Sequence, residues 1–253
     1  EINLNTLKSM KKLQNYINGT LQNPKSDQFF DNFDPSRGIP YSLIPDSDDR
    51  DISEAVTAAK DAFPTWSNLP KQTRSEYILK IAEGIQKRMD EFVKAESLDN
   101  GKPEKLAKDV DIPRAISNFK FFATAILHDA SESHYMEGLG INYTLRKPIG
   151  VVGCISPWNL PLYLFSWKIA PALATGNCVI AKPSEITPMT AYLLSEVCIE
   201  VGLPAGVLNI VHGLGAKTGD AISKDENIKA ISFTGGTQTG KIIASLFSTP
   251  KKC

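Results

Sequence analysis

Two hydrophobic patterns follow one another in the first half of the chain. Residues 12–48 alternate aromatic or apolar residues with Asn, Gly, Asp and Pro, which predicts the short strands and turns of an edge hairpin. From Asp51 the apolar residues recur at helical spacing, and this spacing continues to about residue 130. Gly101 is placed to end one of these helices, and Pro113 lies near the first turn of the next. Residues 51–130 are therefore expected to form a helical layer.

The second half alternates apolar runs with amphipathic segments. Two strand-like runs flank Lys147 and Pro148, and from there strands and helices take turns. Strands that are apolar along their whole length, separated by helices, indicate a parallel sheet covered on both faces. The fold class is therefore α/β, with a Rossmann-like parallel sheet beside the helical layer. The predicted strands are 150–156, 177–183, 206–213 and 230–234, and the predicted helices are 162–175, 190–202, a short one near Thr218, and 237–247.

Polar residues and glycines directly follow four of these strands. They lie in segments 156–159, 182–185, 213–219 and 234–236. Ligands of parallel sheets bind at the carboxyl ends of the strands, so the four segments are expected to meet at one site. The first of them, in VGCISPWNLP (152–161), places a tryptophan and an asparagine where a mere connection would carry Gly, Asp or Ser.

The composition narrows the class of partner. The 28 basic and 28 acidic residues balance, which gives no reason to expect nucleic acid or an anionic membrane. The four cysteines have no metal-ligand spacing and three lie in apolar segments, so we expect no metal site and reduced thiols in the cytoplasm. No apolar run is long enough to cross a bilayer, and no signal sequence opens the chain. Met10 is a candidate first residue, with residues 1–9 as an extension.

Two glycine-rich loops suit a nucleotide. GLGAKTG (213–219) follows an apolar strand, and a glycine turn before a helix lets the backbone approach a phosphate. Its spacing is GxGxxxG, which departs from the usual dinucleotide pattern, so a plain tight turn is an equal alternative. FTGGTQTG (233–240) repeats the arrangement at the next strand end, and the two loops together favour a nucleotide.

The segment AKPSE carries two charged residues directly after a strand. Lys182 and Glu185 are placed to hydrogen-bond the hydroxyls of a ribose. An acid at the ribose disfavours a 2′-phosphate, so NAD is preferred over NADP. The alternative is a solvated loop in which Ser184 or Thr187 caps the following helix.

Asn159 and Lys168 are candidates for catalysis. The Asn159 amide can donate to an oxyanion, which needs a fixed donor beside the reacting carbonyl, or it can cap the helix that begins near Leu160. Lys168 is a charge in an otherwise apolar helix face, and a lysine that extends its ammonium into solvent is the plain alternative. Cys154 is better explained as a small apolar strand residue than as a nucleophile.

Five segments together resemble the aldehyde dehydrogenase superfamily. Their order and spacing agree with that family, and the resemblance covers nearly the whole chain from about Met10. It implies that the chain corresponds to the N-terminal half of such a protein. The segments are ISPWNLP (155–161), WKIAPALATGN (167–177), AKPSE (181–185), GLPAGVLNIVHGLG (202–215) and FTGGTQTG (233–240).

The resemblance implies roles for individual residues. Trp158 would lie near the phosphates of NAD, Asn159 would stabilise the oxyanion of a thiohemiacetal, and Lys168 would take part in a proton relay. Gly236 stands where many members have serine, so a contact to phosphate would be made by the backbone or lost. The implied cofactor-binding residues are Ile155, Ser156, Pro157, Trp158, Lys182, Pro183, Ser184, Glu185, Gly215, Gly219, Phe233, Thr234, Gly235, Gly236 and Thr239.

The chemistry of the family implies residues beyond this chain. Members oxidise an aldehyde by attack of a cysteine thiolate, hydride passes to NAD, and a glutamate activates the water that hydrolyses the thioester. By analogy both residues would follow Cys253, which does not itself stand in the nucleophile's motif. The expected parts are a hairpin and helical region (10–135), oligomerisation strands (136–149) and an NAD-binding domain (150–253), without the catalytic domain.

Within the family, the segments around Arg114 and Trp158 resemble the 2-aminomuconic and 2-hydroxymuconic semialdehyde dehydrogenases more than the betaine aldehyde group. In these semialdehyde dehydrogenases the arginine matching Arg114 binds the substrate carboxylate, because a guanidinium can bind a carboxylate bidentately. An equal alternative for Arg114 is a charged residue on the surface of a helix. A betaine or aliphatic aldehyde is the alternative substrate, and a truncated, inactive NAD-binding fragment is the alternative of another class. INYTLRKP (141–148) would be an oligomerisation strand, implying a homodimer or homotetramer.

Overall fold

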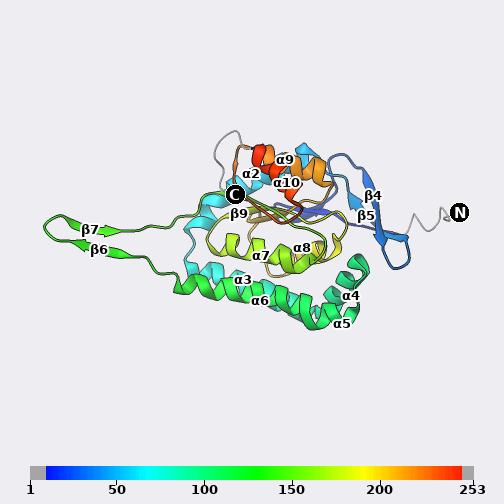
Figure 1. Ribbon diagram of the computed structural model, residues 1–253, viewed down its shortest axis with the longest axis horizontal. Coiled ribbons are helices and arrows are strands. Elements are labelled where there is room, and N and C mark those ends of the chain that lie inside the picture. The colour runs from blue at the N-terminus through cyan, green and yellow to red at the C-terminus, as the bar shows by residue number, and fades with distance from the viewer. Residues whose placement is uncertain (1–9, 247–253) are drawn as a thin grey trace.

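The computed structural model describes residues 10–246 and builds them around a six-stranded sheet (Figure 1). The strand order is β11-β8-β9-β10-β2-β3, in which β8 to β11 are parallel and β2 adds antiparallel to β10. The predicted α/β class is confirmed, while the predicted extension 1–9 and Cys253 lie outside the described residues. The strands are β2 (Asn15–Ile17), β3 (Thr20–Gln22), β8 (Val151–Ile155), β9 (Cys178–Lys182), β10 (Leu208–Ile210) and β11 (Ile228–Phe233).

The strand order creates a switch point between β8 and β11. From β8 the chain moves outward through β9 to β10, and it then returns across the sheet to β11 on the other side of β8. A crevice opens where the direction of travel reverses, at the carboxyl ends of these two strands, and open parallel sheets bind ligands there. The fold therefore directs attention to the loops that follow β8 and β11.

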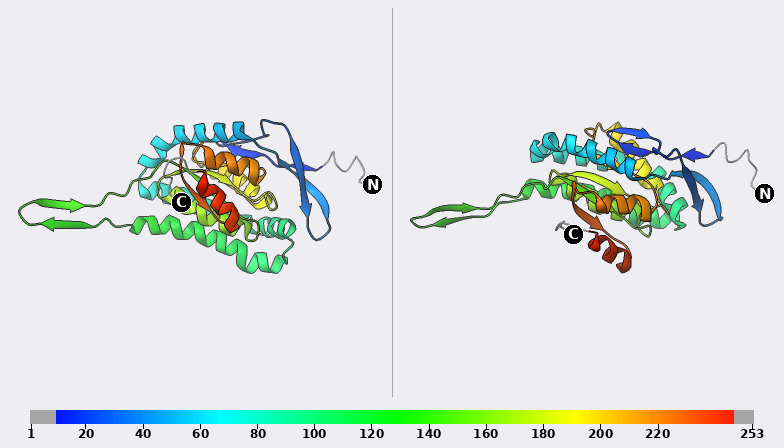
Figure 2. Two further views of the ribbon diagram at one scale, coloured as in Figure 1. Left: turned by 45° about the horizontal axis from the view of Figure 1, so that its top comes forward. Right: turned by 90° about the horizontal axis from the view of Figure 1, so that it is seen from above.

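Helices cover both faces of the sheet. α2 and α9 lie on one face and α7 and α8 on the other, while α3 and α6 pack against the outer side of α7 (Figures 1 and 2). Because β8 and β9 are buried throughout, their residues are apolar without alternation, except for Lys182 at the end of β9. The helices are α2 (Asp49–Asn68), α3 (Lys71–Lys87), α4 (Met89–Asn100), α5 (Glu104–Leu106), η1 (Ala107–Asp111), α6 (Ile112–Ala125), η2 (Ile126–His128), α7 (Pro161–Ala174), α8 (Met189–Glu200), η3 (Gly215–Gly219), α9 (Asp220–Lys224) and α10 (Thr237–Ser245).

The helical layer has more breaks than the sequence pattern predicts. The apolar pattern that runs toward Gly101 is divided into α3 and α4, which meet at Arg88. Gly101 ends α4 as predicted, with a φ of 78° that glycine adopts without steric penalty. Pro113 lies in the first turn of α6, also as predicted. No described helix combines the length and apolar character needed to cross a bilayer.

Two smaller sheets lie at opposite ends of the molecule (Figure 1). At one end β4 (Phe29–Asp34) pairs antiparallel with β5 (Ile39–Pro45), and β1 (Lys11–Lys12) adds parallel to β5. At the other end β6 (Ser133–Met136) and β7 (Gly140–Tyr143) form a projecting hairpin whose residues are all exposed. The expected boundary of the oligomerisation strands, at residue 136, therefore falls inside this hairpin.

Candidate cofactor and substrate site

Backbone hydrogen bonds hold three of the predicted site segments side by side. The Ser156 N–H donates to the Lys182 carbonyl at 3.2 Å, which joins the loop after β8 to the end of β9. The Thr234 N–H donates to the Ile155 carbonyl, also at 3.2 Å, which joins the end of β8 to the loop after β11. The sheet thus brings together the strand ends that the sequence analysis selected.

The loop after β8 becomes exposed as it approaches α7. Trp158 is 52% exposed, and Asn159 is exposed as well. Within residues 10–246 the Asn159 carboxamide has no hydrogen-bond partner, so its donors are available to a ligand. α7 begins after Leu160 without a side-chain cap. The alternative in which Asn159 caps this helix is therefore wrong.

Lys182 and Glu185 form an ion pair at the end of β9, in which the lysine is buried and the glutamate is partly exposed. The Lys182 side chain is 2% exposed, and its ammonium donates to the Pro183 carbonyl at 2.8 Å and to Glu185 Oε2 at 2.9 Å. Burial lowers the pKa of Lys182, while the Glu185 carboxylate opposes this shift. Glu185 Oε1 accepts from the Gly215 N–H at 3.4 Å, which links the pair to the loop after β10. A solvated loop is therefore excluded for this lysine.

Lys168 reaches the site from inside α7. Its side chain is buried rather than extended into solvent, so the plain alternative for this residue is wrong. The ammonium donates a hydrogen bond to the Thr234 hydroxyl. Burial lowers the pKa of Lys168, and the neighbouring Cys154 acts in the opposite direction. The structure thus places a lysine with weakened basicity beneath the loop after β11.

In the two glycine-rich loops, two of the glycines lie so close to neighbouring atoms that an added Cβ would clash with them. Gly213 has a φ of 147°, and a Cβ atom there would lie 2.1 Å from the Thr218 hydroxyl oxygen. A Cβ at Gly219 would lie 3.7 Å from Lys182 Cδ, so this glycine packs beside the aliphatic stem of that lysine. Gly235 packs on the ring of Phe233, whereas nothing lies within 4 Å of a Cβ built at Gly236. Thr239 is exposed on α10, and its hydroxyl makes no hydrogen bond with the described residues.

Arg114 lies outside the group of strand ends. It is an exposed residue of α6, and its guanidinium carbon lies 5.4 Å from the centroid of the Tyr163 ring. Tyr163 is in the first turn of α7, four residues after Asn159. Arg114 therefore lies against the helix that follows the oxyanion candidate, and its guanidinium makes no hydrogen bond or ion pair with a predicted site residue among those described.

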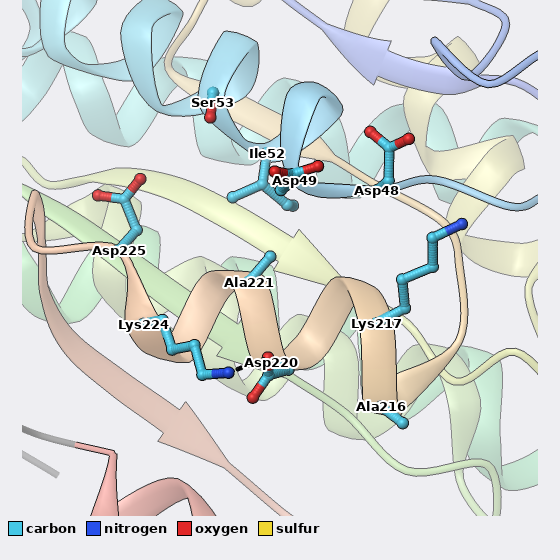
Figure 3. Close-up of a pocket in the computed structure, with 10 residues that line it drawn as sticks. All are labelled: Asp48, Asp49, Ile52, Ser53, Ala216, Lys217, Asp220, Ala221, Lys224 and Asp225. Carbon is cyan, nitrogen blue, oxygen red and sulfur yellow. Dashed lines mark ion pairs between the residues drawn. The ribbon is translucent and has the colours of Figure 1, made fainter.

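Two clefts help to delimit the site. One, of about 390 Å³, is lined by Trp158 and Glu185 together with β4 and the end of α4. The other, of about 490 Å³, lies between the start of α2 and the η3–α9 segment (Figure 3). Its wall includes an ion pair between Lys224 and Asp220 at 2.7 Å, but none of the predicted cofactor residues. The first cleft, rather than the second, belongs to the candidate site.

The cysteines of the described chain are not candidates for nucleophilic attack. Cys154, Cys178 and Cys198 are buried and unpaired. Burial raises the pKa of the Cys154 thiol to about 12, so it stays protonated near neutral pH. The interpretation of Cys154 as a packed strand residue fits this environment.

Sequence reasoning missed polar residues that surround the site. His212, after β10, is buried, and neither ring nitrogen has a hydrogen-bond partner in the described part of the chain. Burial, with a smaller effect of Lys182, lowers its pKa to about 3. Asp99 accepts from the Met189 N–H at 2.6 Å, so this residue of α4, rather than Ser184 or Thr187, holds the start of α8. The sequence analysis located this part of α4 only through Gly101, the glycine that ends the helix, and gave no sign of the contact made by Asp99.

Comparisons with known proteins identify the family. The aldehyde dehydrogenase family model matches residues 22–253. The chain is 49% identical to 2-aminomuconic semialdehyde dehydrogenase of Danio rerio, over 91% of this chain and 47% of the relative. It is 43% identical to 2-hydroxymuconic semialdehyde dehydrogenase of Pseudomonas sp. strain CF600, over 92% of this chain and 49% of the relative. A Bacillus cereus aldehyde dehydrogenase in complex with NAD⁺ matches with a TM-score of 0.92 and 33% identity, over 98% of this chain and 51% of that one.

The chain belongs to the aldehyde dehydrogenase family. It spans about half the length of the curated relatives it matches. The resemblance drawn from the five sequence segments is thereby confirmed, and so is the branch that includes dehydrogenases of muconic semialdehydes. An oxidoreductase acting on an aldehyde is the class of enzyme that this family defines.

Proposed function

We propose that the natural protein containing this chain uses NAD to oxidise a carboxylated aldehyde, such as 2-aminomuconic or 2-hydroxymuconic semialdehyde, to the acid. The observation that carries the proposal is the ion pair between the buried Lys182 and the partly exposed Glu185 at the carboxyl end of β9. The nucleophilic cysteine and the general-base glutamate lie beyond residue 253. The described part of the chain supplies cofactor binding and the oxyanion donor.

The residues around Lys182 fit NAD. Two of the three ammonium protons are used by Pro183 and Glu185, which leaves the third for a ribose hydroxyl. The Glu185 carboxylate accepts a hydrogen bond from the other ribose hydroxyl and repels the 2′-phosphate of NADP. The backbones of Gly215 and Gly219 approach the adenine and diphosphate side because no side chain intervenes. Bound NAD supplies the hydride acceptor.

The loop after β8 stabilises charge during the reaction. Asn159 has free amide donors and aims one at the oxyanion of the thiohemiacetal formed with the cysteine. Lys168 is a candidate for proton relay because burial lowers its pKa and its ammonium contacts Thr234. Trp158 borders the phosphates with its exposed indole.

Arg114 binds the substrate carboxylate. Its guanidinium is exposed and lies over Tyr163, at the start of the helix that follows Asn159. A planar guanidinium supplies two parallel donors to a carboxylate, which favours an acidic semialdehyde over a neutral aldehyde.

The hairpin of β6 and β7 mediates assembly into a homodimer or homotetramer. An isolated two-stranded hairpin is only marginally stable in water, and this one exposes large apolar side chains. Leu139 is 84% exposed, Tyr135 76% and Ile141 68%. A second copy of the chain would cover them.

The buried, unpaired cysteines fit a reducing compartment, and we assign the protein to the cytoplasm.

Nucleotide titration of the purified chain tests the cofactor site. Calorimetry should detect binding of NAD and much weaker binding of NADP. Lys182→Ala should weaken NAD binding by about tenfold or more, since a charge-assisted hydrogen bond contributes about 1.5–3 kcal/mol. Glu185→Gln should narrow the preference for NAD over NADP. Lys60→Ala, which removes an exposed lysine of α2, is the matched control. A folded chain that binds neither nucleotide would overturn the proposal.

A further inference from the structure

The C-terminal end of α4 contacts two of the connections of the candidate site, those that follow β8 and β9. The Asn100 side-chain amide donates to the Trp158 carbonyl at 2.9 Å, in the loop after β8. The Asp99 carboxylate accepts from the Met189 N–H at 2.6 Å, where the loop after β9 enters α8. Glu96 Oε2 lies 3.5 Å from the Leu162 N–H in the first turn of α7, at the limit of a hydrogen bond. Three side chains from one helix end therefore hold backbone groups of two neighbouring site loops.

The geometry of this helix end is fixed locally. Gly101 takes a left-handed conformation, and its N–H donates to the Ser97 carbonyl at 2.8 Å. The Ser97 hydroxyl donates to the Lys102 carbonyl at 2.6 Å. The Lys102 ammonium turns back onto buried carboxylates, at 2.6 Å from Asp111 and 3.3 Å from Glu96. Asn100 is therefore presented from a rigid turn rather than from a mobile loop.

The hydrogen bond from Asn100 acts on the peptide group that precedes the oxyanion candidate. The Trp158 carbonyl belongs to the planar unit that links Trp158 to Asn159, so fixing the oxygen fixes the orientation of that plane. Among the described residues, the bond from Asn100 to the Trp158 carbonyl is the one hydrogen bond made by the backbone N–H and C=O groups of residues 157–159. The direction of the Asn159 Cα–Cβ bond depends on this plane.

We propose that Asn100 is a positioning residue, which aims the Asn159 carboxamide by holding the Trp158 carbonyl. The inference rests on the proposed function, in which Asn159 donates to the oxyanion. An oxyanion donor must lie about 2.7–3.1 Å from the developing charge, and a misplacement of about 1 Å can lower a rate by about a hundredfold. In this role Asn100, which also lines the cleft beside Trp158, acts through the Trp158 carbonyl rather than on the aldehyde.

Replacing the Asn100 amide by a carboxylate of the same shape tests the hydrogen bond to Trp158 separately from the packing of the side chain. Asn100→Asp keeps the size of the side chain but loses the N–H donor, and Asn100→Ala removes the group altogether. Asn68→Asp is the matched control, because Asn68 is likewise the last residue of its helix and donates its amide to a backbone carbonyl, that of Pro64 at 2.8 Å. Each variant is made in the natural protein that contains this chain.

Two readouts are needed. In both Asn100 variants, kcat for aldehyde oxidation should fall by about tenfold or more, while KM for the aldehyde and Kd for NAD stay within about twofold. Amide hydrogen exchange of Leu162 and Leu164, whose N–H groups lie within hydrogen-bond reach of Glu96 Oε2 and of the Leu160 carbonyl, should accelerate by about tenfold or more, with no such change in Asn68→Asp. Because unfolding of part of the sample also lowers the apparent kcat at constant KM, kcat is calculated per folded protein, whose fraction is measured by urea unfolding.

The outcomes distinguish this inference from the proposed function. Unchanged kcat and unchanged exchange in the Asn100 variants would overturn the inference, and so would a rise in KM at constant kcat. If the unaltered protein oxidises no aldehyde, the proposed function fails, and hydrogen exchange then decides the role of Asn100. Exchange that accelerates only in the Asn100 variants would support its hold on the loop, and unchanged exchange would refute it.

Discussion

The ammonium of Lys168 in α7 donates a hydrogen bond to the hydroxyl of Thr234, which follows β11. The contact crosses the switch point of the sheet, because α7 follows β8 and Thr234 follows the strand on its other side. The lysine is buried, and burial lowers its pKa. Its charged form is therefore less favourable in the folded protein than in the unfolded chain.

Lys168→Met should stabilise the fold at neutral pH. Because the pKa of Lys168 is lower in the folded state, its charge destabilises the fold at low and neutral pH, and this effect disappears as pH rises from the folded pKa toward 10.5. The variant should gain about 1 kcal/mol at pH 7, and the gain should shrink toward pH 10. Urea unfolding at several pH values measures both. Lys60→Met, which removes an exposed ammonium bonded to Asn227, controls for loss of a surface charge. A variant less stable than this control at pH 7 would contradict the account.

Gly213 is the glycine whose replacement should be most damaging to the loop after β10. Its φ of 147° is unsuited to other residues, and an added Cβ would lie 2.1 Å from the Thr218 hydroxyl oxygen. Gly213→Ala should lower the free energy of unfolding by about 2 kcal/mol or more. Gly236→Ala is the stability control, because Gly236 has an ordinary φ of −66° and open space around a Cβ. Denaturant unfolding should separate the two, and equal losses would refute the steric argument.

Arg114 decides between an acidic and a neutral substrate. In the natural protein, Arg114→Ala should raise KM for a carboxylated semialdehyde by about tenfold or more, because a charged hydrogen bond contributes about 1.5–3 kcal/mol. KM for a neutral aliphatic aldehyde should change less than about twofold. Arg37→Ala, in the exposed turn between β4 and β5, is the control. Steady-state kinetics with the two aldehydes makes the comparison, and equal effects would remove the carboxylate role of Arg114.

The sequence predicts the sheet well because buried parallel strands are apolar along their whole length. Each predicted strand of the second half is present, and the segments after them converge as expected for one sheet edge. The environment of Lys168 could not be predicted, since one charge on an apolar helix face fits both burial and exposure. Only the packing of α7 against the sheet, together with Thr234, determines which occurs.

Contacts between distant segments account for the other differences. The break at Arg88 follows from a guanidinium that binds Glu91 locally and Glu196 and Glu200 in α8, more than a hundred residues away. Asn100 was visible only as the residue before a helix-ending glycine, because its partner, Trp158, is 58 residues further along the chain. Local patterns carry no information on such pairs.

Glu96, Lys102 and Asp111 form a buried cluster of two carboxyl groups and one ammonium beside the start of α7. With both carboxyls ionised, the cluster carries a net negative charge in a region shielded from water. Burial raises the pKa of Glu96 from 4.5 to about 7, with Lys102 opposing the shift and Asp111 adding to it. The cluster therefore holds one extra proton at mildly acidic pH, which makes it neutral.

Glu96→Gln should reveal this proton as a change in the pH dependence of stability. The folded state keeps a proton that the unfolded chain releases above pH 4.5, so the wild type loses stability as pH rises from 4.5 through 7. The loss should be at most about 3 kcal/mol. Glutamine mimics the protonated form, so the stability of the variant relative to the wild type should increase from pH 5 to pH 8. Glu104→Gln, at an exposed position of α5, is the control, and urea unfolding across this range measures the difference. A difference between wild type and Glu96→Gln that stays constant from pH 5 to 8 would show that Glu96 is ionised throughout.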